Sequence, residues 1–201
     1  MRELIVNTFA TLDGVMQAPG GPEEDPSDGF DHGGWSFGYW DEVMQGVMGE
    51  SMSKPFDLVL GRKTYEIFAA FWPNSDDPGA EPLNKATKHV ASTTLRELEW
   101  ENSKLIEGEL PEGVGALKEE DGPELQVHGS ANLIQTLLEH GLIDEFRLWT
   151  FPLVLGTGKR LFDGGTVPAG LELTSSQASS TGVITATYRS GAEIKYGSFA
   201  E

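Results

Sequence analysis

The stretch FDLVLGRKTYE, residues 56–66, decides the fold. Its first half is a short apolar run, which predicts a buried strand. Its second half begins a helix, because residues 63–72 have helical spacing and Pro73 stops them. Arg62 and Lys63 therefore fall at a helix N-terminus, where cations oppose the helix dipole. The sequence predicts an anion close to this turn.

The charge balance limits what that anion is. The chain has 201 residues and a formal net charge of −18, from 32 acidic against 14 basic side chains. Long-range attraction to nucleic acid or to an anionic membrane surface is therefore disfavoured, whereas a small anion held by a local basic spot is allowed. Besides Arg62-Lys63, only Lys159-Arg160 is a pair of adjacent basic residues. We expect that second pair to be a solvated hairpin corner.

Several site classes are excluded by the residues present. The chain has no cysteine, so it has no disulfide, no thiolate nucleophile and no cysteine-based metal site. His32 lies among acids, but no second ligand has suitable spacing, and we predict no metal. GTGK at 156–159 lacks the glycine spacing of a nucleotide-triphosphatase loop. The first apolar run is too short for a secretory signal and no segment approaches a membrane span, so a cytoplasmic protein is expected.

Strands and helices alternate along the chain. Strands are predicted at 3–10, 56–60, 88–93, 103–108, 124–129 and 145–155, helices at 39–52, 63–72 and 130–141, and a hairpin at 170–179 and 182–191. This α/β alternation predicts a mostly parallel sheet with helices on both faces and antiparallel strands at its C-terminal edge. The length fits one domain over residues 1–201.

Two predicted strands end in sequences typical of ligand turns. These are GRKT at 61–64 and HGSAN at 128–132. In parallel sheets ligands lie outside the carboxyl ends of the strands. Each turn has a glycine at the strand exit, where backbone can approach a ligand, and then a helix whose free N–H groups can bind phosphate. The two turns together predict a phosphate-containing ligand.

Four segments carry a family resemblance. They are TLDGVM at 11–16, LGRKTYE at 60–66, VHGSANLIQTLL at 127–138 and LIDEFRLWTFPLVLGTGKRLF at 142–162. In order and spacing the chain resembles the dihydrofolate reductase-like superfamily, and within it the reductase domain of the RibD riboflavin-biosynthesis enzyme. The resemblance implies a three-layer dihydrofolate reductase-like fold. It also implies NADPH as the cofactor and, from this branch of the family, a homodimer.

The resemblance assigns the cofactor residues. The basic group of the family's Gly-Arg-x-Thr segment meets the 2′-phosphate of NADPH, and the helix N-terminus meets the pyrophosphate. The implied cofactor-binding residues are Gly61, Arg62, Lys63, Thr64, Ser92, Thr93, Gly129, Ser130, Ala131, Asn132 and Leu133. One departure is Ser130, where the family usually has the second glycine of a pair.

The substrate side is less defined. Trp35, Tyr39 and Trp40 are candidate substrate contacts, with core anchoring as the alternative, and Thr150 is the strand residue that faces the substrate in the family. Dihydrofolate reductases carry an acid on the first helix, but the matching position here is Gln45. We therefore expect Asp41, with Glu42 or water as alternatives, to supply the catalytic proton. His128 is expected to be a satisfied strand-end histidine.

These patterns predict an NADPH-dependent reductase that transfers a hydride to a small heterocyclic or carbonyl substrate. Alternatives are a genuine dihydrofolate or ribosylamino-pyrimidine reductase, or a non-catalytic NADPH-binding module such as a sensor. A complete RibD enzyme is not expected, because no deaminase domain is present. The acidic segment at 17–34 has little apolar sequence, so we expect it to be a lid that orders on ligand binding, with Trp35 as its anchor.

Overall fold

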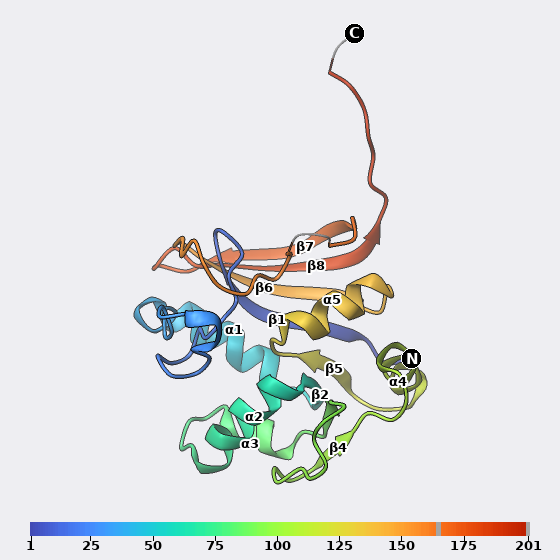
Figure 1. The fold of residues 1–201 in the computed structure, drawn as a ribbon. Helices are drawn as coiled ribbons and strands as arrows, with labels where there is room; N and C mark the ends of the chain where they lie inside the picture. The colour runs from blue at the N-terminus through green and yellow to red at the C-terminus, as the bar shows by residue number, and fades with distance from the viewer. Residues whose placement is uncertain (164–165, 200–201) are drawn as a thin grey trace.

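The computed structural model describes residues 1–163 and 166–199, and its strands form one eight-stranded sheet (Figure 1). The strands are β1 Leu4–Thr11, β2 Phe56–Gly61, β3 Lys88–Ala91, β4 Ser103–Leu105, β5 Glu124–Val127, β6 Glu145–Phe151, β7 Gly170–Ala178 and β8 Ile184–Ala192. Their order is β4-β3-β2-β5-β1-β6-β8-β7. Strands β1 to β6 are parallel, and β8 is antiparallel to β6 and β7. The predicted mostly parallel sheet with antiparallel C-terminal strands is confirmed.

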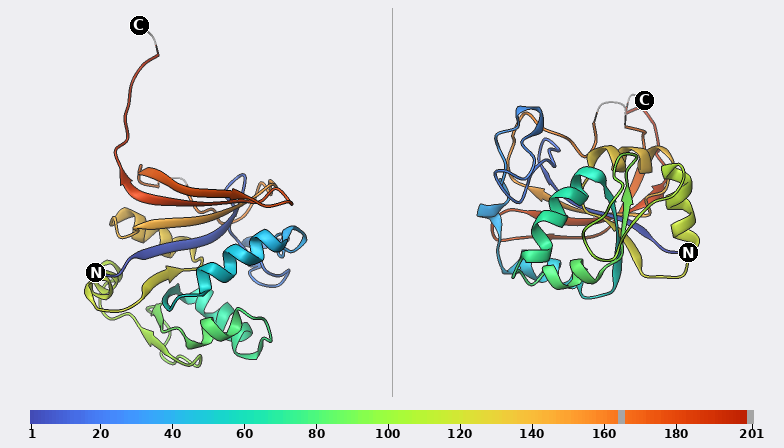
Figure 2. Two further views of the ribbon diagram at one scale, coloured as in Figure 1. Left: turned by 180° about the vertical axis from the view of Figure 1, so that it is seen from behind. Right: turned by 60° about the horizontal axis from the view of Figure 1, so that its bottom comes forward.

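Helices cover both faces of this sheet (Figure 2). They are α1 Glu42–Met52, α2 Arg62–Phe71, α3 Ala80–Lys85, α4 Leu110–Glu119 and α5 Ala131–Glu139. Helices α4 and α5 pack on one face, and α1, α2 and α3 pack on the other. The sequence did not predict α3 and α4. Proline lies in both, and α4 also holds two glycines, so their local sequences favour turns over helix.

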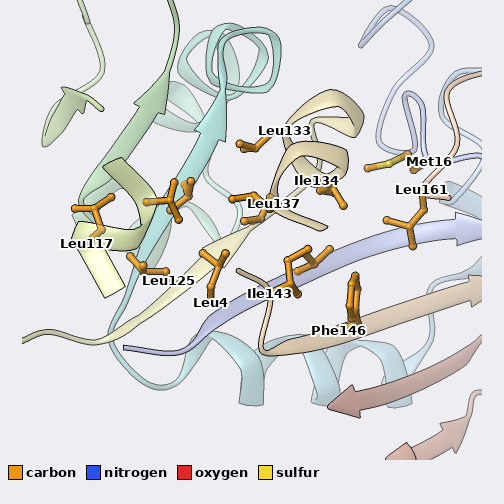
Figure 3. Close-up of a cluster of buried hydrophobic side chains, with 14 residues drawn as sticks. Leu4, Met16, Leu117, Leu125, Leu133, Ile134, Leu137, Ile143, Phe146 and Leu161 are labelled. Atoms are coloured by element: carbon orange, nitrogen blue, oxygen red, sulfur yellow. The ribbon is translucent and has the colours of Figure 1, made fainter. Parts of the chain in front are cut away.

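The largest core lies between the sheet and the α4–α5 layer (Figure 3). Leu4 and Val6 of β1 face this core, whereas Phe9 packs in the cluster on the α1 side. The alternation follows from the two-residue period of a strand. Core side chains of α5, including Ile134 and Leu137, are fully buried against the sheet. Both faces of β1 are therefore buried, as its continuous apolar sequence predicted.

The position of β5 determines which strand ends meet at the edge where a ligand is expected. Although it comes late in the chain, β5 lies between β2 and β1. The carboxyl ends of β2 and β5 are therefore neighbours, and each leads into a helix, α2 and α5. Such a change of strand order opens a crevice at the carboxyl edge of a sheet. Within the described residues, no helix is long and apolar enough to span a membrane.

Candidate functional site

The two predicted ligand turns lie against each other. The backbone N–H of Gly61 donates a hydrogen bond of 3.1 Å to the Ser130 hydroxyl, and that hydroxyl lies 2.5 Å from Thr64 Oγ1. A Cβ on Gly61 would lie 2.6 Å from Ser130 Oγ. Gly61 is thus required for the close approach of Ser130, and the approach of a ligand to Gly61 stays a prediction. This contact fixes the N-termini of α2 and α5 side by side.

The turn before α5 has an unusual backbone. Gly129 and Ser130 have φ of 93° and 73°, a region that serine adopts at a steric cost. The two hydrogen bonds of the Ser130 hydroxyl offset part of that cost. Helix α5 then begins at Ala131, which places Ala131, Asn132 and Leu133 in its first turn. Their N–H groups have no partner within the helix, as in any first turn.

The predicted basic pair lies in the first turn of α2. Arg62 and Lys63 are exposed, and the Arg62 guanidinium contacts Glu66 one turn on at 3.2 Å. The unfavourable charge at this N-terminus is thus partly balanced within the helix. Lys63 forms no ion pair with any of the residues that the structure describes. An unpaired cation and a half-exposed arginine remain at the ligand edge.

Ser92 and Thr93 follow β3, the strand next to β2. The Ser92 hydroxyl accepts hydrogen bonds from the N–H groups of Thr94 and Leu95, at 3.2 and 2.9 Å. Thr93 is exposed. These two residues therefore lie in a hydrogen-bonded turn at the same carboxyl edge as Gly61, and within the described residues the Thr93 hydroxyl has no hydrogen-bond partner.

Three predicted substrate aromatics lie together on the α1 face. Trp35 and Tyr39 pack edge-on against Phe151, with ring centroids 5.1 and 5.6 Å apart. Trp35 also donates from Nε1 to the carbonyl of Gln17, so it anchors the preceding loop. Trp40 packs against Phe9 but remains 38% exposed. Trp40 is the most exposed of the three, since Trp35 and Tyr39 are half-buried.

Thr150 does not join them. Trp149 and Phe151 of β6 pack on the α1 side, whereas Phe146 and Leu148 pack toward the α5 side. Side chains alternate along a strand, so Thr150 faces the α5 side. Thr150 therefore lies on the other face of the sheet from the three aromatics, and its contact with a substrate stays a prediction.

Asp41 is the N-cap of α1. One carboxylate oxygen accepts from Met44 N–H at 2.9 Å, and the other accepts from the N–H and hydroxyl of Ser180, both at 2.7 Å. Helix α1 is thus tied to the β7–β8 turn. The hydrogen bonds from Met44 and Ser180 lower the pKa of Asp41. These contacts favour an ionised structural carboxylate and do not support Asp41 as the proton donor.

Asp41→Ala should therefore lower the melting temperature by roughly 3 °C, since it removes a helix cap, and leave NADPH affinity unchanged. Because the folded pKa is lowered, the carboxylate stabilises the fold above its unfolded pKa of about 3.9 and loses this effect as the pH falls through the folded pKa. Thermal unfolding of Asp41→Ala measures this, with exposed Glu42→Ala as the matched control. A large loss of turnover with an unchanged melting temperature would restore the catalytic assignment.

The long loop before α1 is folded onto the body. Phe30 is buried against Val15 and Ala18. Asp25 is also buried, and Lys159 Nζ contacts its carboxylate at 2.6 Å. The prediction that the loop lacks apolar surface to hold itself in place is wrong. The prediction that Lys159 lies in a solvated hairpin corner is also wrong, since its side chain forms an ion pair with Asp25 of this loop.

His128 lies just after β5 and has a hydrogen-bond partner, which agrees with the predicted strand-end histidine. Its ring follows β5, stacks on Phe56 and meets Phe68 of α2 edge-on. Its Nε2 lies 2.6 Å from Gln126 Oε1, and the half-buried ring has its pKa lowered to about 4, first by burial and then by the Arg147 cation. The sequence ELQVH already indicates this polar row. Glu124, Gln126 and His128 are every second residue, so their side chains lie on the same face of a buried strand.

A separate cleft lies beside α1. It has a volume of about 510 Å³, and its lining includes Asn7, Ser51, Arg147, Gln177 and Thr187. Glu124 and Glu145 at the amino ends of β5 and β6 also line it. None of the predicted site residues lines this cleft. The chemistry expected from the two glycine turns therefore lies at the opposite, carboxyl edge of the sheet.

Relatives of similar length have been found by sequence. YyaP, an uncharacterized protein of Bacillus subtilis (strain 168), is 28% identical over 196 residues, which cover 93% of this chain and 94% of YyaP. YwjB, an uncharacterized protein of the same organism, is 29% identical over 105 residues, covering 52% of this chain and 57% of YwjB.

Solved structures share the fold. A putative riboflavin biosynthesis protein from Shewanella sp. PV-4 matches with a TM-score of 0.67 and 21% identity, over 94% of this chain and 99% of that one. A pyrimidine reductase-like protein from Corynebacterium diphtheriae matches at 0.64 with 12% identity, over 96% and 93%. Dihydrofolate reductase from Enterococcus faecalis, in complex with NADP(H) and RAB-propyl, matches at 0.59 with 13% identity, over 94% and 97%. The dihydrofolate reductase-like fold is confirmed.

The family model of the RibD C-terminal domain matches residues 2–185. That range contains all strands from β1 to β7, both glycine turns and every predicted site residue. The chain belongs to the RibD C-terminal domain family.

Proposed function

We propose that this protein is an NADPH-dependent reductase that transfers a hydride to a small heterocyclic or carbonyl substrate. The observation that carries the proposal is the juxtaposition of the α2 and α5 N-termini by Gly61 and Ser130, beside exposed Arg62 and Lys63. Two first turns and two cations in one place suit a ligand with several phosphate groups. Membership of a reductase family supports the same reading.

Different residues at the carboxyl edge of the sheet would bind different parts of the cofactor. Arg62 and Lys63 would hold the 2′-phosphate, and Ser92 and Thr93 would flank it from the next strand. The N–H groups of Thr64 and of residues 131–133 would hold the pyrophosphate, as free first-turn donors do for phosphates in general. When bound, the cofactor supplies the hydride, and the protein positions the two partners and excludes water.

The substrate would lie on the α1 face of the sheet, where Trp40 packs on Phe9 and Trp149 and remains partly exposed. On α1, Gly46 and Gly49 are exposed and have no atoms within 4 Å of a Cβ position, so they face solvent. Asp41 is held by Met44 and Ser180, and we infer that water supplies the proton instead. A pterin, a ribosylamino-pyrimidine and a quinone are candidate substrates that would distinguish the members of this family.

The direct test is hydride transfer. Loss of NADPH absorbance is followed with the wild-type chain and a panel of dihydropterins, ribosylamino-pyrimidines and quinones. We expect turnover with at least one of them. Tight NADPH binding without turnover across the panel would favour the alternative, a non-catalytic NADPH-binding module. Absence of NADPH binding would contradict both.

We also propose a homodimer through the C-terminal hairpin. Leu173 of β7 and Ile184 of β8 are 53% and 41% exposed. Beyond β8 the chain extends away from the body, and its Tyr196 is 84% exposed (Figure 1). Exposed apolar groups on an edge hairpin are typical of an interface.

Light scattering at micromolar concentration should therefore give twice the chain mass of 21.8 kDa. Leu173→Glu should shift this mass toward that of one chain, because it places a charge in the apolar contact. Exposed Leu12→Glu, which lies outside the hairpin, is the matched control and should leave the dimer intact. A wild-type mass of 21.8 kDa would rule the dimer out.

A further inference from the structure

A chain of hydrogen bonds runs along the α1 side of β5 to His128. Arg147 of β6 makes two bonds to the Glu124 carboxylate, at 2.8 and 3.1 Å. Glu124 accepts from the side-chain amide of Gln126 at 2.6 Å, and Gln126 Oε1 lies 2.6 Å from His128 Nε2. Each link is buried or half-buried. The imidazole is thus held at the end of a fixed polar series.

This series determines which ring nitrogen carries the proton. The Gln126 amide nitrogen faces Glu124, an acceptor only, and also the carbonyl of Ser51 at 3.5 Å. The amide oxygen must therefore face His128, and it can only accept. Nε2 consequently donates its N–H to Gln126. In the neutral ring Nδ1 then has no proton and presents a lone pair.

The surroundings keep the ring neutral. Burial lowers the pKa of His128 most, Arg147 lowers it further, and Glu124 raises it by a smaller amount, to about 4 in all. The side chains of β2 and α2 that meet the ring, Phe56 and Phe68, are uncharged. At neutral pH the imidazole is therefore a hydrogen-bond acceptor at Nδ1 and not a cation.

Nδ1 is available to a ligand. Within residues 1–163 and 166–199 no group forms a hydrogen bond with Nδ1. The atom is also not fully buried, because the buried side-chain atoms without a partner do not include it. It therefore reaches solvent. His128 immediately precedes Gly129 of the α5 turn and lies on the face between α1 and α2. The ring therefore lies next to the turn at which the proposed cofactor would bind, on the face of the sheet that α1 covers.

We propose that His128 Nδ1 is a fixed, uncharged acceptor that selects substrates bearing a ring N–H donor, such as the imide N–H of a pyrimidine or pteridine. A substrate with a carbonyl or a methylated nitrogen at that point would leave the two acceptors facing each other or would clash. This inference rests on the proposed function for the substrate's position, whereas the state of the imidazole does not depend on it.

The first experiment needs no ligand. Nitrogen-15 NMR of the full chain, with His128→Phe to assign the signal, should show a protonated Nε2, an unprotonated Nδ1 and no titration until the pH approaches about 4. Gln126→Leu removes the acceptor and should give a mixture of the two neutral tautomers. A proton on Nδ1 in the wild type, or titration near the ordinary histidine pKa of about 6.5, would overturn the proposal.

The second experiment tests selection in the NADPH-saturated protein. Lumazine, a pteridine with two ring N–H groups, is compared with its derivatives methylated at N1 and at N3. We expect one methylation to weaken binding by roughly tenfold, the worth of one hydrogen bond. His128→Phe should abolish that difference, since it keeps an aromatic ring between Phe56 and Phe68 but has no acceptor. His128→Asn, which keeps an acceptor oxygen, should retain part of it.

The outcomes separate the two proposals. Equal affinities for all lumazines in the wild type, or no lumazine binding by a chain that binds NADPH, would contradict the role of His128 and leave the reductase proposal standing. Failure to bind NADPH would contradict the reductase proposal, while the NMR result would still report on the imidazole. A purely structural His128 would lower the stability of both variants without changing the ratio of lumazine affinities.

Discussion

Replacing Arg62 and Lys63 together with alanine should weaken NADPH binding by about tenfold to a hundredfold and leave NADH binding unchanged. The two side chains are exposed at the first turn of α2, and Lys63 forms no ion pair within the part of the chain that the structure describes. A phosphate there would gain a charge-assisted contact that NADH lacks. Calorimetric titration of both nucleotides measures the change.

The control must separate the loss of a local phosphate contact from the change in the protein's net charge. The chain has a formal net charge of −18, which itself repels an anionic nucleotide. Lys85→Ala combined with Arg189→Ala also removes two exposed cations, which pair with Glu81 and Glu3 away from the ligand edge. This control should lower NADPH affinity by less than about twofold. Equal losses in both double variants would mean that net charge, and not a phosphate site, governs binding.

Replacing residues 20–31 by a short Gly-Ser link should unfold the protein or destabilise it by several kcal/mol. The segment contains Phe30, which is 6% exposed, and truncating a buried phenylalanine alone costs roughly 3 to 5 kcal/mol. It also contains Asp25, so Lys159 would lose its partner. The sequence predicted a lid that could be removed without loss of the fold, and the buried Phe30 contradicts that expectation.

A point substitution in the loop tests its structural role without removing the whole segment. Phe30→Ala should shift the urea midpoint strongly, whereas Phe37→Ala, a residue that is 85% exposed in the same loop, should shift it little. Urea unfolding followed by circular dichroism compares them. Similar small shifts for both variants, with full NADPH affinity, would return the loop to the role of a detachable lid.

The sequence was sufficient where local signals agreed. FDLVLG followed by RKTYE combines a buried strand, a glycine exit and a helix start, and the structure has β2 and α2 there within one residue of the prediction. The strand predicted over 145–155 instead ends at Phe151, because Pro152 cannot donate to a sheet ladder. The fold could therefore be predicted from the pattern of apolar residues, because strands that are buried on both faces of the sheet need apolar side chains on both.

The site was harder because its contacts are distant in sequence. The bond between Gly61 and Ser130 and the ion pair between Lys159 and Asp25 join residues that only the folded sheet brings together. The catalytic role expected for Asp41 stays a prediction. The structure shows Asp41 as the N-cap of α1, a role that is typical of an aspartate just before a helical sequence such as EVMQGV.

The most direct test of the central claim is a calorimetric titration of the wild-type chain with NADPH and, separately, with NADH. The account predicts binding of one nucleotide per chain, with NADPH preferred by about tenfold to a hundredfold. In the proposed site, Arg62 and Lys63, beside the Gly61 and Ser130 contact, would hold the phosphate on the adenosine ribose, which NADH lacks. Equal affinities for the two nucleotides, or no binding of either, would contradict it.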